Sequence, residues 1–174
     1  MKKALSTFAA GLALCATASA RAAEAANCLN PQEMHGFVAY FLPKVLDEVS
    51  RNCTALPADS YVRTGMPHLA AQLQDARQAA WPMARSAFLK FAPPGDVKAI
   101  AGLSDDALRP LVDEVMASKM SISITPAACG DANDILEALA PLSAEQGVHL
   151  VATILTLAAR GGSKMPTTCP REAP

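Results

Sequence analysis

The stretch NPQEMHGFVAYFLPKVLDEV, residues 30–49, decides the fold class of this chain. Asn30 is a preferred N-cap residue, Pro31 suits the first helical position, and Glu33 can reach back to complete a capping box. Pro43 falls on the face opposite the apolar residues, so we expect it to kink the helix and not to end it. The apolar residues follow at alternating steps of three and one, which line one face of an α-helix: Met34, Phe37, Val38, Phe41, Leu42, Val45, Leu46 and Val49.

The rest of the chain continues in the same manner. Leucines, alanines and a final phenylalanine keep a helical stripe over residues 67–91. Ser104, Thr125 and Ser143 are each placed to cap a further helix. Residues 120–124 alternate like a strand, but an isolated strand has no pairing partner, so we expect an extended connector there. The expected helices are 31–50, 67–91, 96–101, 104–116, 126–140 and 144–160.

The last of these helices is apolar almost all round. Its polar residues occupy one narrow strip, a pattern typical of a helix that is buried among other helices. We therefore expect helix 144–160 to lie at the centre of the bundle. The residues of the polar strip are Glu145, His149, Thr153, Thr156 and Arg160.

These patterns predict an all-α fold, a compact bundle of five or six helices stabilised by two disulfides. A length of 174 residues suits one domain, which we place at residues 27–170. The 15 Lys+Arg nearly balance the 16 Asp+Glu, and only 18% of the residues are charged. Because binding to nucleic acid requires clustered cations, we expect no nucleic-acid partner.

Residues 1–22 are interpreted as a secretory signal peptide, with cleavage near residues 20–26. Two lysines precede a run of small apolar residues that is too short to span a membrane, and alanines of the type that signal peptidase prefers follow. Leu14 directly before Cys15 does not fit the lipoprotein motif, so no lipid is expected on Cys15. The sequence therefore predicts a periplasmic or secreted protein without an integral membrane segment after cleavage.

Four cysteines remain after cleavage, an even number that suits an exported protein with two disulfides. None is spaced as CxxC, so neither a thioredoxin-like motif nor a zinc knuckle is indicated. If residues 31–50 form one helix, about 30 Å separates Cys28 from Cys53, whereas a disulfide needs Cα atoms within about 7 Å. A Cys129–Cys169 bridge would leave Cys28 and Cys53 to pair with each other across that distance. Bridges that cross from the first helix to the last two helices are therefore favoured, with both crossed pairings open.

No catalytic, cofactor or metal site is expected. His35, His68 and His149 are far apart, and no HxxxH pair places two of them on one helix face. Residues 130–134 hold oxygen ligands at the wrong spacing for a calcium loop. Residues 160–164 look like a phosphate loop but follow a helix, whose C-terminal end repels anions. No GxSxG nucleophile motif is present. Adjacent carboxylates are expected to face solvent, at residues 47–48, 105–106 and 113–114.

Trp81 is the single tryptophan and lies four residues from both Arg77 and Arg85. At that helical spacing either guanidinium can reach the indole in a cation–π contact. We expect the two arginines to cover the indole as part of the fold and not to mark a binding site.

These features favour a non-enzymatic module that acts by contact with another envelope or secreted protein. From Cys129 to Pro170, a cysteine, a helix, a short turn with a proline, a second helix and a closing Cys-Pro resemble the outline of periplasmic immunity proteins that block type VI secretion toxins. This resemblance covers the last quarter of the chain and implies an inhibitor or immunity role; an envelope adaptor is a related possibility. The alternative is a carrier of small apolar ligands, or an accessory protein of an envelope enzyme, with a pocket lined by Phe37, Phe41, Trp81, Phe88 and Phe91.

Overall fold

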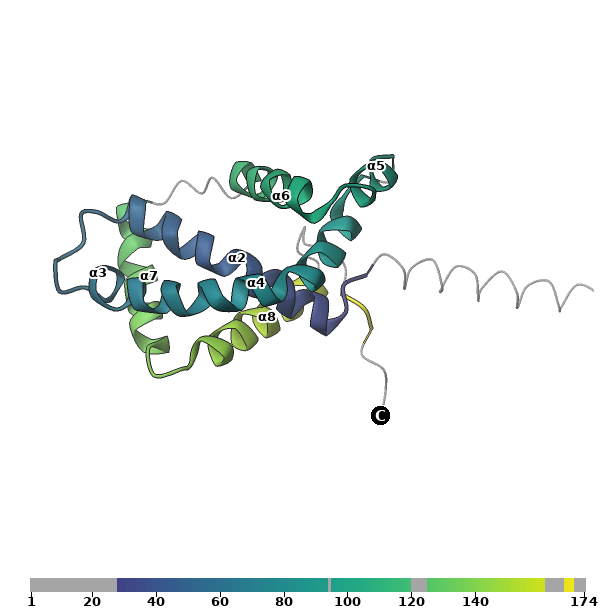
Figure 1. Ribbon diagram of the computed structural model, residues 1–174. Helices are drawn as coiled ribbons and strands as arrows, with labels where there is room; N and C mark the ends of the chain where they lie inside the picture. Colours follow the sequence, from purple (N-terminus) through teal and green to yellow (C-terminus); the bar gives the residue numbers. More distant parts are fainter. Residues whose placement is uncertain (1–27, 94, 120–124, 162–167, 171–174) are drawn as a thin grey trace, which may run out of the picture.

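The computed structural model describes residues 28–93, 95–119, 125–161 and 168–170, and the regular elements in these ranges are all α-helices. The expected all-α fold is confirmed. The signal peptide and the connector at residues 120–124 lie outside the described residues. A four-residue helix after the first long helix was not predicted. The helices are α2 (Pro31–Asn52), α3 (Tyr61–Thr64), α4 (Met66–Phe91), α5 (Val97–Ala101), α6 (Asp105–Lys119), α7 (Pro126–Leu139) and α8 (Ala144–Arg160) (Figure 1).

Four helices begin at the capping residues that the sequence indicates; at α6, the Ala107 N–H donates to Ser104 Oγ at 3.4 Å. At α2, the Asn30 side chain accepts a hydrogen bond from the Glu33 N–H at 2.8 Å, and the Glu33 carboxylate accepts one from the Asn30 N–H at 2.9 Å. Ser143 and Gln146 form the same reciprocal capping box at α8. Thr125 caps α7 through its hydroxyl oxygen. These bonds satisfy N–H groups that the first turn of a helix otherwise leaves unpaired.

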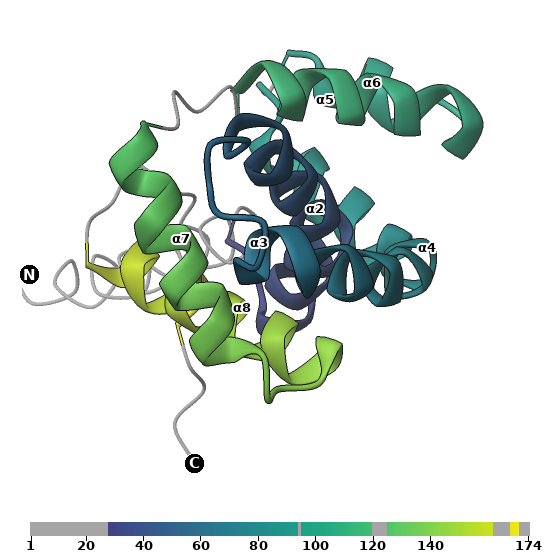
Figure 2. The same ribbon diagram turned by 90° about the vertical axis from the view of Figure 1, so that its left-hand side faces the viewer.

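Helix α2 is the centre of the fold. Helix α4 runs beside it, and Figures 1 and 2 show α6 and α8 on opposite sides of it. From Glu33 to Leu46, no residue of α2 is exposed. Pro43 is among the fully buried residues, so the expectation that it lies on an outer face is wrong. The apolar stripe marks only one buried face, whereas α2 is covered from several directions.

Helices α2 and α4 approach each other closely at Gly36. A Cβ atom at this position would overlap the Met83 Cβ and would lie 3.3 Å from the backbone nitrogen of Ala84. Ala84 and Ala87 are among the buried residues of α4. Small side chains on both helices therefore allow their backbones to pack tightly.

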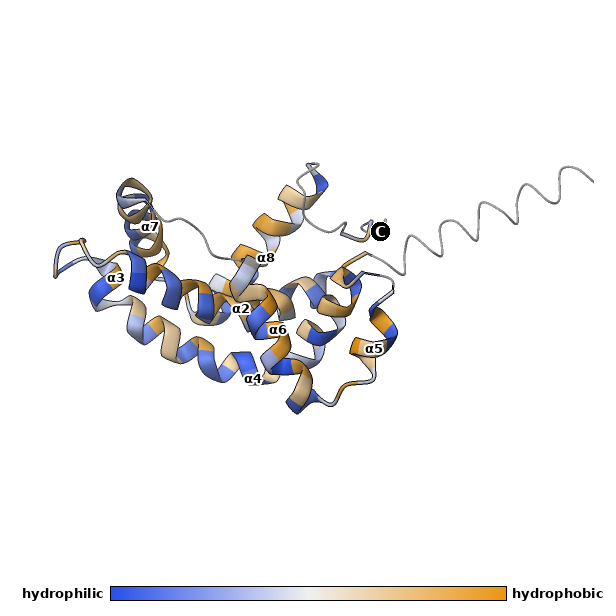
Figure 3. Cartoon of the chain, turned by 90° about the horizontal axis from the view of Figure 1, so that it is seen from above, coloured by the Kyte–Doolittle hydropathy of each residue, from blue (hydrophilic) through white to orange (hydrophobic). Residues whose placement is uncertain are grey.

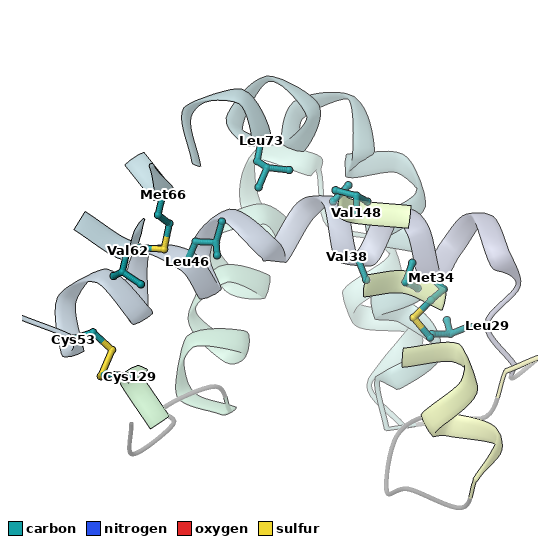
Figure 4. Close-up of a cluster of buried hydrophobic side chains, with 13 residues drawn as sticks. Leu29, Met34, Val38, Leu46, Cys53, Val62, Met66, Leu73, Cys129 and Val148 are labelled. Carbon is teal, nitrogen blue, oxygen red and sulfur yellow. A yellow bond between two sulfur atoms is a disulfide. The ribbon is translucent and has the colours of Figure 1, made fainter. Parts of the chain in front are cut away.

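The buried side chains form two clusters that share a boundary at Phe37 and Ala80. The first runs along α2, from Leu29 and Met34 at one end to Val62 and Met66 at the other (Figure 4). The second is rich in aromatic residues and holds α6 against α2 and α4; its buried members are Tyr40, Phe41, Trp81, Ala84, Phe88, Leu108 and Val112.

Helix α8 does not lie at the centre, so that prediction is wrong. It packs mainly on α2 through one face, where Val148 and Ala152 are its buried residues. Ile154 and Leu157 are 54% and 59% exposed. The physical reason is that α4 and α6 already cover other sides of α2, so α8 packs mainly on the remaining side of α2, with a smaller contact to α4. Figure 3 shows the end of α8 extending away from the α2–α4 pair, with apolar residues along it.

Candidate functional site

The four cysteines form two disulfides, Cys28–Cys169 and Cys53–Cys129. The predicted crossed arrangement is confirmed, and the structure selects one of the two crossed pairings. Cys28 precedes α2 and Cys53 follows it, so each end of α2 is bound to one end of the segment that contains α7 and α8. Beside the first bridge, the Cys169 N–H donates to the Leu29 carbonyl at 2.9 Å. Disulfides of this kind indicate an oxidising, extracytoplasmic setting.

Glu33 is the buried charged residue of the described core, at 4% exposure. Its carboxylate accepts hydrogen bonds from Lys90 Nζ at 2.7 Å and from Ser86 Oγ at 2.6 Å, in addition to the capping bond. Burial alone would raise the pKa of Glu33, but the bonds from Lys90, Ser86 and the Asn30 N–H outweigh it and hold the pKa below its ordinary value. Lys90 also donates to the Cys28 carbonyl at 2.8 Å. This network is a structural joint between α2, α4 and the first disulfide.

A second ionic network holds α6. Arg77 of α4 donates to both carboxylate oxygens of Asp113 at 2.7 Å, and Lys44 of α2 lies 3.5 Å from the same carboxylate. Asp113 was expected to face solvent, and this is wrong, because the helix turns it toward two cations. Burial and the neighbouring Asp113 carboxylate raise the pKa of Tyr40. All four groups serve packing between helices.

The cation–π prediction at Trp81 names the wrong arginine. Arg109 of α6 lies over the indole, with its guanidinium carbon 4.9 Å from the ring centroid. Arg77 lies over Tyr40 instead, at 4.4 Å, and Arg85 pairs with Asp105 at 3.3 Å. The helical spacing predicted a contact within α4, whereas α6 supplies the cation from another part of the chain. Trp81 is buried at 1% exposure and belongs to the core.

Two of the three histidines meet in the structure. His35 of α2 and His149 of α8 have ring centroids 6.4 Å apart, and His35 Nε2 lies 3.3 Å from a carboxylate oxygen of Glu145. Their separation in the sequence concealed this contact. Within the described ranges, no group of three His, Cys, Asp or Glu side chains is arranged to hold a metal ion. His68 is exposed on α4.

The two loop-like motifs have structural roles where the structure describes them. Residues 130–134 are helical within α7, and Asn133 Oδ1 accepts a hydrogen bond from the Val62 N–H of α3 at 3.2 Å. Of residues 160–164, Arg160 and Gly161 end α8, and the rest lie outside the described residues.

Helix α7 presents a surface that the sequence reasoning did not single out. Ile135 is 60% exposed, and the exposed carboxylates of Asp131, Asp134 and Glu137 lie on the same helix. Helix α7 contains no Lys, Arg or His. Asp131, Asp134 and Ile135 are spaced at three and one, which places them on one face of the helix, and we call these three residues the α7 acidic surface. The signal in the sequence was an isoleucine placed among acids, which helix periodicity alone assigns to the core.

Comparisons with known proteins leave the chain without a match: no protein-family model, curated protein or solved structure matches it. Among the described helices, none has the length and apolar content needed to cross a membrane.

Proposed function

We propose that the protein is a non-enzymatic interaction module of the periplasm that binds another envelope or secreted protein, in an inhibitor, immunity-like or adaptor role. The observation that carries this proposal is the α7 acidic surface. The Ile135 side chain is 60% exposed, so it offers apolar area that contact with a partner would remove from water.

The frame behind this surface is suited to binding. The Cys53–Cys129 disulfide joins the start of α7 to the end of α2, and the Asn133–Val62 hydrogen bond fixes the same helix to α3. A helix that is held in one place loses little conformational freedom when a partner binds, so less of the contact energy is spent on ordering.

The chemistry of the partner follows from the charges. The carboxylates of Asp131 and Asp134, on a helix without a cation, favour a partner with lysine or arginine around an apolar pocket that accepts Ile135. Oppositely charged surfaces increase the rate of association and select against acidic partners.

The carrier alternative receives less support. The five aromatic residues that would line its pocket pack as core: Phe41, Trp81 and Phe88 are buried. The ring of Phe37 lies 4.7 Å from that of Phe41 and 5.3 Å from that of Phe91.

The test is affinity capture from an envelope extract with the oxidised protein, quantified by mass spectrometry. Ile135→Asp should remove the captured partner, whereas Leu111→Asp, at another exposed apolar residue, should retain it. Asp131→Lys with Asp134→Lys should weaken capture and should make it less sensitive to salt. A partner that both Ile135→Asp and Leu111→Asp retain equally would contradict the proposal.

A further inference from the structure

The two disulfides differ in how far their cysteines are open to solvent. Both cysteines of the Cys53–Cys129 bridge are buried, at 1% and 5% exposure. In the Cys28–Cys169 bridge, Cys28 is 2% exposed, whereas Cys169 is only half-buried. A thiolate that exchanges with a disulfide has to reach one of its two sulfur atoms. In the folded protein, Cys169 is therefore the cysteine that an external thiolate can approach most easily.

The surroundings of Cys28 favour its release as a thiolate. Cys28 lies two residues before Asn30, the N-cap of α2, and is therefore near the positive end of that helix dipole. Lys90 Nζ donates to the Cys28 carbonyl at 2.8 Å, which brings an ammonium group to the same residue. Glu33 accepts from the same ammonium at 2.7 Å and offsets part of its charge. A cysteine beside a lysine or a helix N-terminus carries negative charge more readily, and a more stable thiolate leaves a disulfide faster.

The Cys53–Cys129 bridge lies at the opposite end of α2. Figure 4 shows it at one end of the first cluster, with Leu29, the residue after Cys28, at the other end. Cys53 is the C-cap of α2, where the helix dipole is negative and opposes a thiolate. Cys129 lies near the start of α7, but release of Cys129 would require attack on the buried Cys53. Access therefore separates the two bridges, and charge sets the direction of attack at the open one.

We propose that the Cys28–Cys169 disulfide is a site of thiol–disulfide exchange with a dithiol protein of the CxxC class, and that the Cys53–Cys129 disulfide is closed to exchange in the folded protein. One thiolate of the dithiol attacks Cys169 Sγ, the bond between Cys28 and Cys169 breaks, and its electron pair stays on Cys28 Sγ. The second thiolate of the dithiol attacks the dithiol sulfur of this mixed disulfide and releases Cys169. The dithiol is oxidised by two electrons to its own disulfide, and the two protons that it loses pass to Cys28 and Cys169.

Exchange at this site releases the chain after α8 from the start of α2. Contacts such as the hydrogen bond from the Cys169 N–H to the Leu29 carbonyl then hold it without a covalent bond. Helix α7 stays joined to α2 through the Cys53–Cys129 bridge. The α7 acidic surface keeps its frame in both redox states, so this inference does not rest on the partner proposed above.

The first experiment compares the rates at which the two bridges open in the oxidised full chain. Reduced thioredoxin serves as the CxxC probe, and samples are quenched with N-ethylmaleimide and mapped by mass spectrometry. The cysteines of the Cys28–Cys169 bridge should be alkylated at least about tenfold faster than those of the Cys53–Cys129 bridge, because burial protects the latter. Circular dichroism should show that most of the helix content remains when only the first bridge is open. Equal rates at the two bridges, or loss of the helix content when the first opens, would overturn the proposal.

The second experiment tests the direction of attack. A thioredoxin variant without its resolving cysteine cannot complete the exchange and stays linked to the sulfur that it attacks. The linked peptide should contain Cys169. A link to Cys28 would show that the direction of attack is the reverse of the one proposed.

The third experiment tests the cation beside the leaving sulfur. Lys90→Met should slow the opening of the Cys28–Cys169 bridge severalfold, and Lys90→Arg, which keeps the charge, should retain the rate. Because Lys90→Met leaves the buried Glu33 without its partner, the double variant with Glu33→Gln is measured beside it and should also be slow. Lys98→Met is the matched control, since it removes the same charge from an exposed residue of α5 and should leave the rate unchanged. A wild-type rate in the double variant would show that Lys90 does not assist the release of Cys28.

Discussion

Helices α2 and α8 have similar sequence features but differ in how much of each helix is buried. Each begins with a complete capping box, and each carries an extensive apolar pattern. Helix α8 is the more apolar of the two in sequence, yet α2 is covered over Glu33–Leu46 whereas α8 is buried through Val148 and Ala152. The comparison shows that the burial of a helix depends on how many neighbours the topology supplies, and that excess apolar surface remains available for other contacts.

The largest expected effect is the loss of a disulfide. Replacing Cys28 and Cys169 by alanine opens a loop with a sequence separation of 141 residues, and the Cys53–Cys129 loop has a separation of 76. In the chain-entropy model each bridge alone stabilises the fold by about 4 to 5 kcal/mol. Urea unfolding of the two double variants measures both losses.

Removing the Cys28–Cys169 disulfide should affect α8 and α2 differently. Helix α8 is held by one packed face, and the chain after it is tied by the Cys28–Cys169 disulfide. We therefore expect the variant without Cys28 and Cys169 to lose amide protection in α8 first and to keep it in α2. Hydrogen exchange resolves the two helices. Equal loss of protection in both would show that α8 is as firmly integrated as α2.

Leucine truncation should give the next largest contrast. Leu46 of α2 is 4% exposed, and Leu157 of α8 is 59% exposed. Leu46→Ala should lower the free energy of unfolding by about 2 to 5 kcal/mol, because it leaves a cavity in the core. Leu157→Ala should change it by less than about 0.5 kcal/mol. Both are measured by urea unfolding; similar losses of free energy of unfolding at the two positions would contradict the burial contrast.

Replacing either of two helical glycines by alanine should change the free energy of unfolding, in opposite directions at the two positions. Gly36→Ala places a methyl group against the Met83 side chain and should destabilise the protein by about 1 to 3 kcal/mol. Gly147 in α8 has open space at the Cβ position, so Gly147→Ala should stabilise it by up to about 1 kcal/mol through helix propensity. Thermal unfolding measures both. A stabilising Gly36→Ala would mean that α2 and α4 are less tightly packed than described.

The sequence was sufficient for features that depend on neighbouring residues. The capping boxes at Asn30 and Ser143, and the continuity of α2 through Pro43, follow from local rules and are confirmed. The crossed disulfides were favoured as well, because a continuous helix keeps Cys28 and Cys53 apart.

Features that depend on distant residues were not predictable. Asp113 is on α6 and its partner Arg77 on α4, and no spacing within either helix reveals their contact. The same holds for His35 with His149 and for Arg109 with Trp81. The exposure of Ile154 and Leu157 on α8 was missed for the same reason, since periodicity describes a helix alone and not its neighbours.

The finest contrast is between the two capping boxes in their response to pH. The box of α2 uses Glu33, which titrates, and that of α8 uses Gln146, which does not. The pKa of Glu33 is held below its ordinary value of 4.5. Its contribution to stability is therefore fully present above pH 4.5 and is lost as the pH falls through the lower, folded pKa. Glu33→Gln should destabilise the protein at pH 7, because Lys90 then lacks its charged partner.

The difference in free energy of unfolding between the wild type and Glu33→Gln should decrease as the pH is lowered from 7 toward 3. Urea unfolding at each pH measures it. All other carboxylates are common to both proteins, so the difference in free energy of unfolding reports Glu33. Gln146→Glu is the matched control at α8: Gln146 is exposed, and its replacement should add little pH dependence. If the gap between wild type and Glu33→Gln stays constant down to pH 3, the buried joint between α2 and α4 does not depend on the Glu33 charge, and the central position of α2 rests on apolar packing alone.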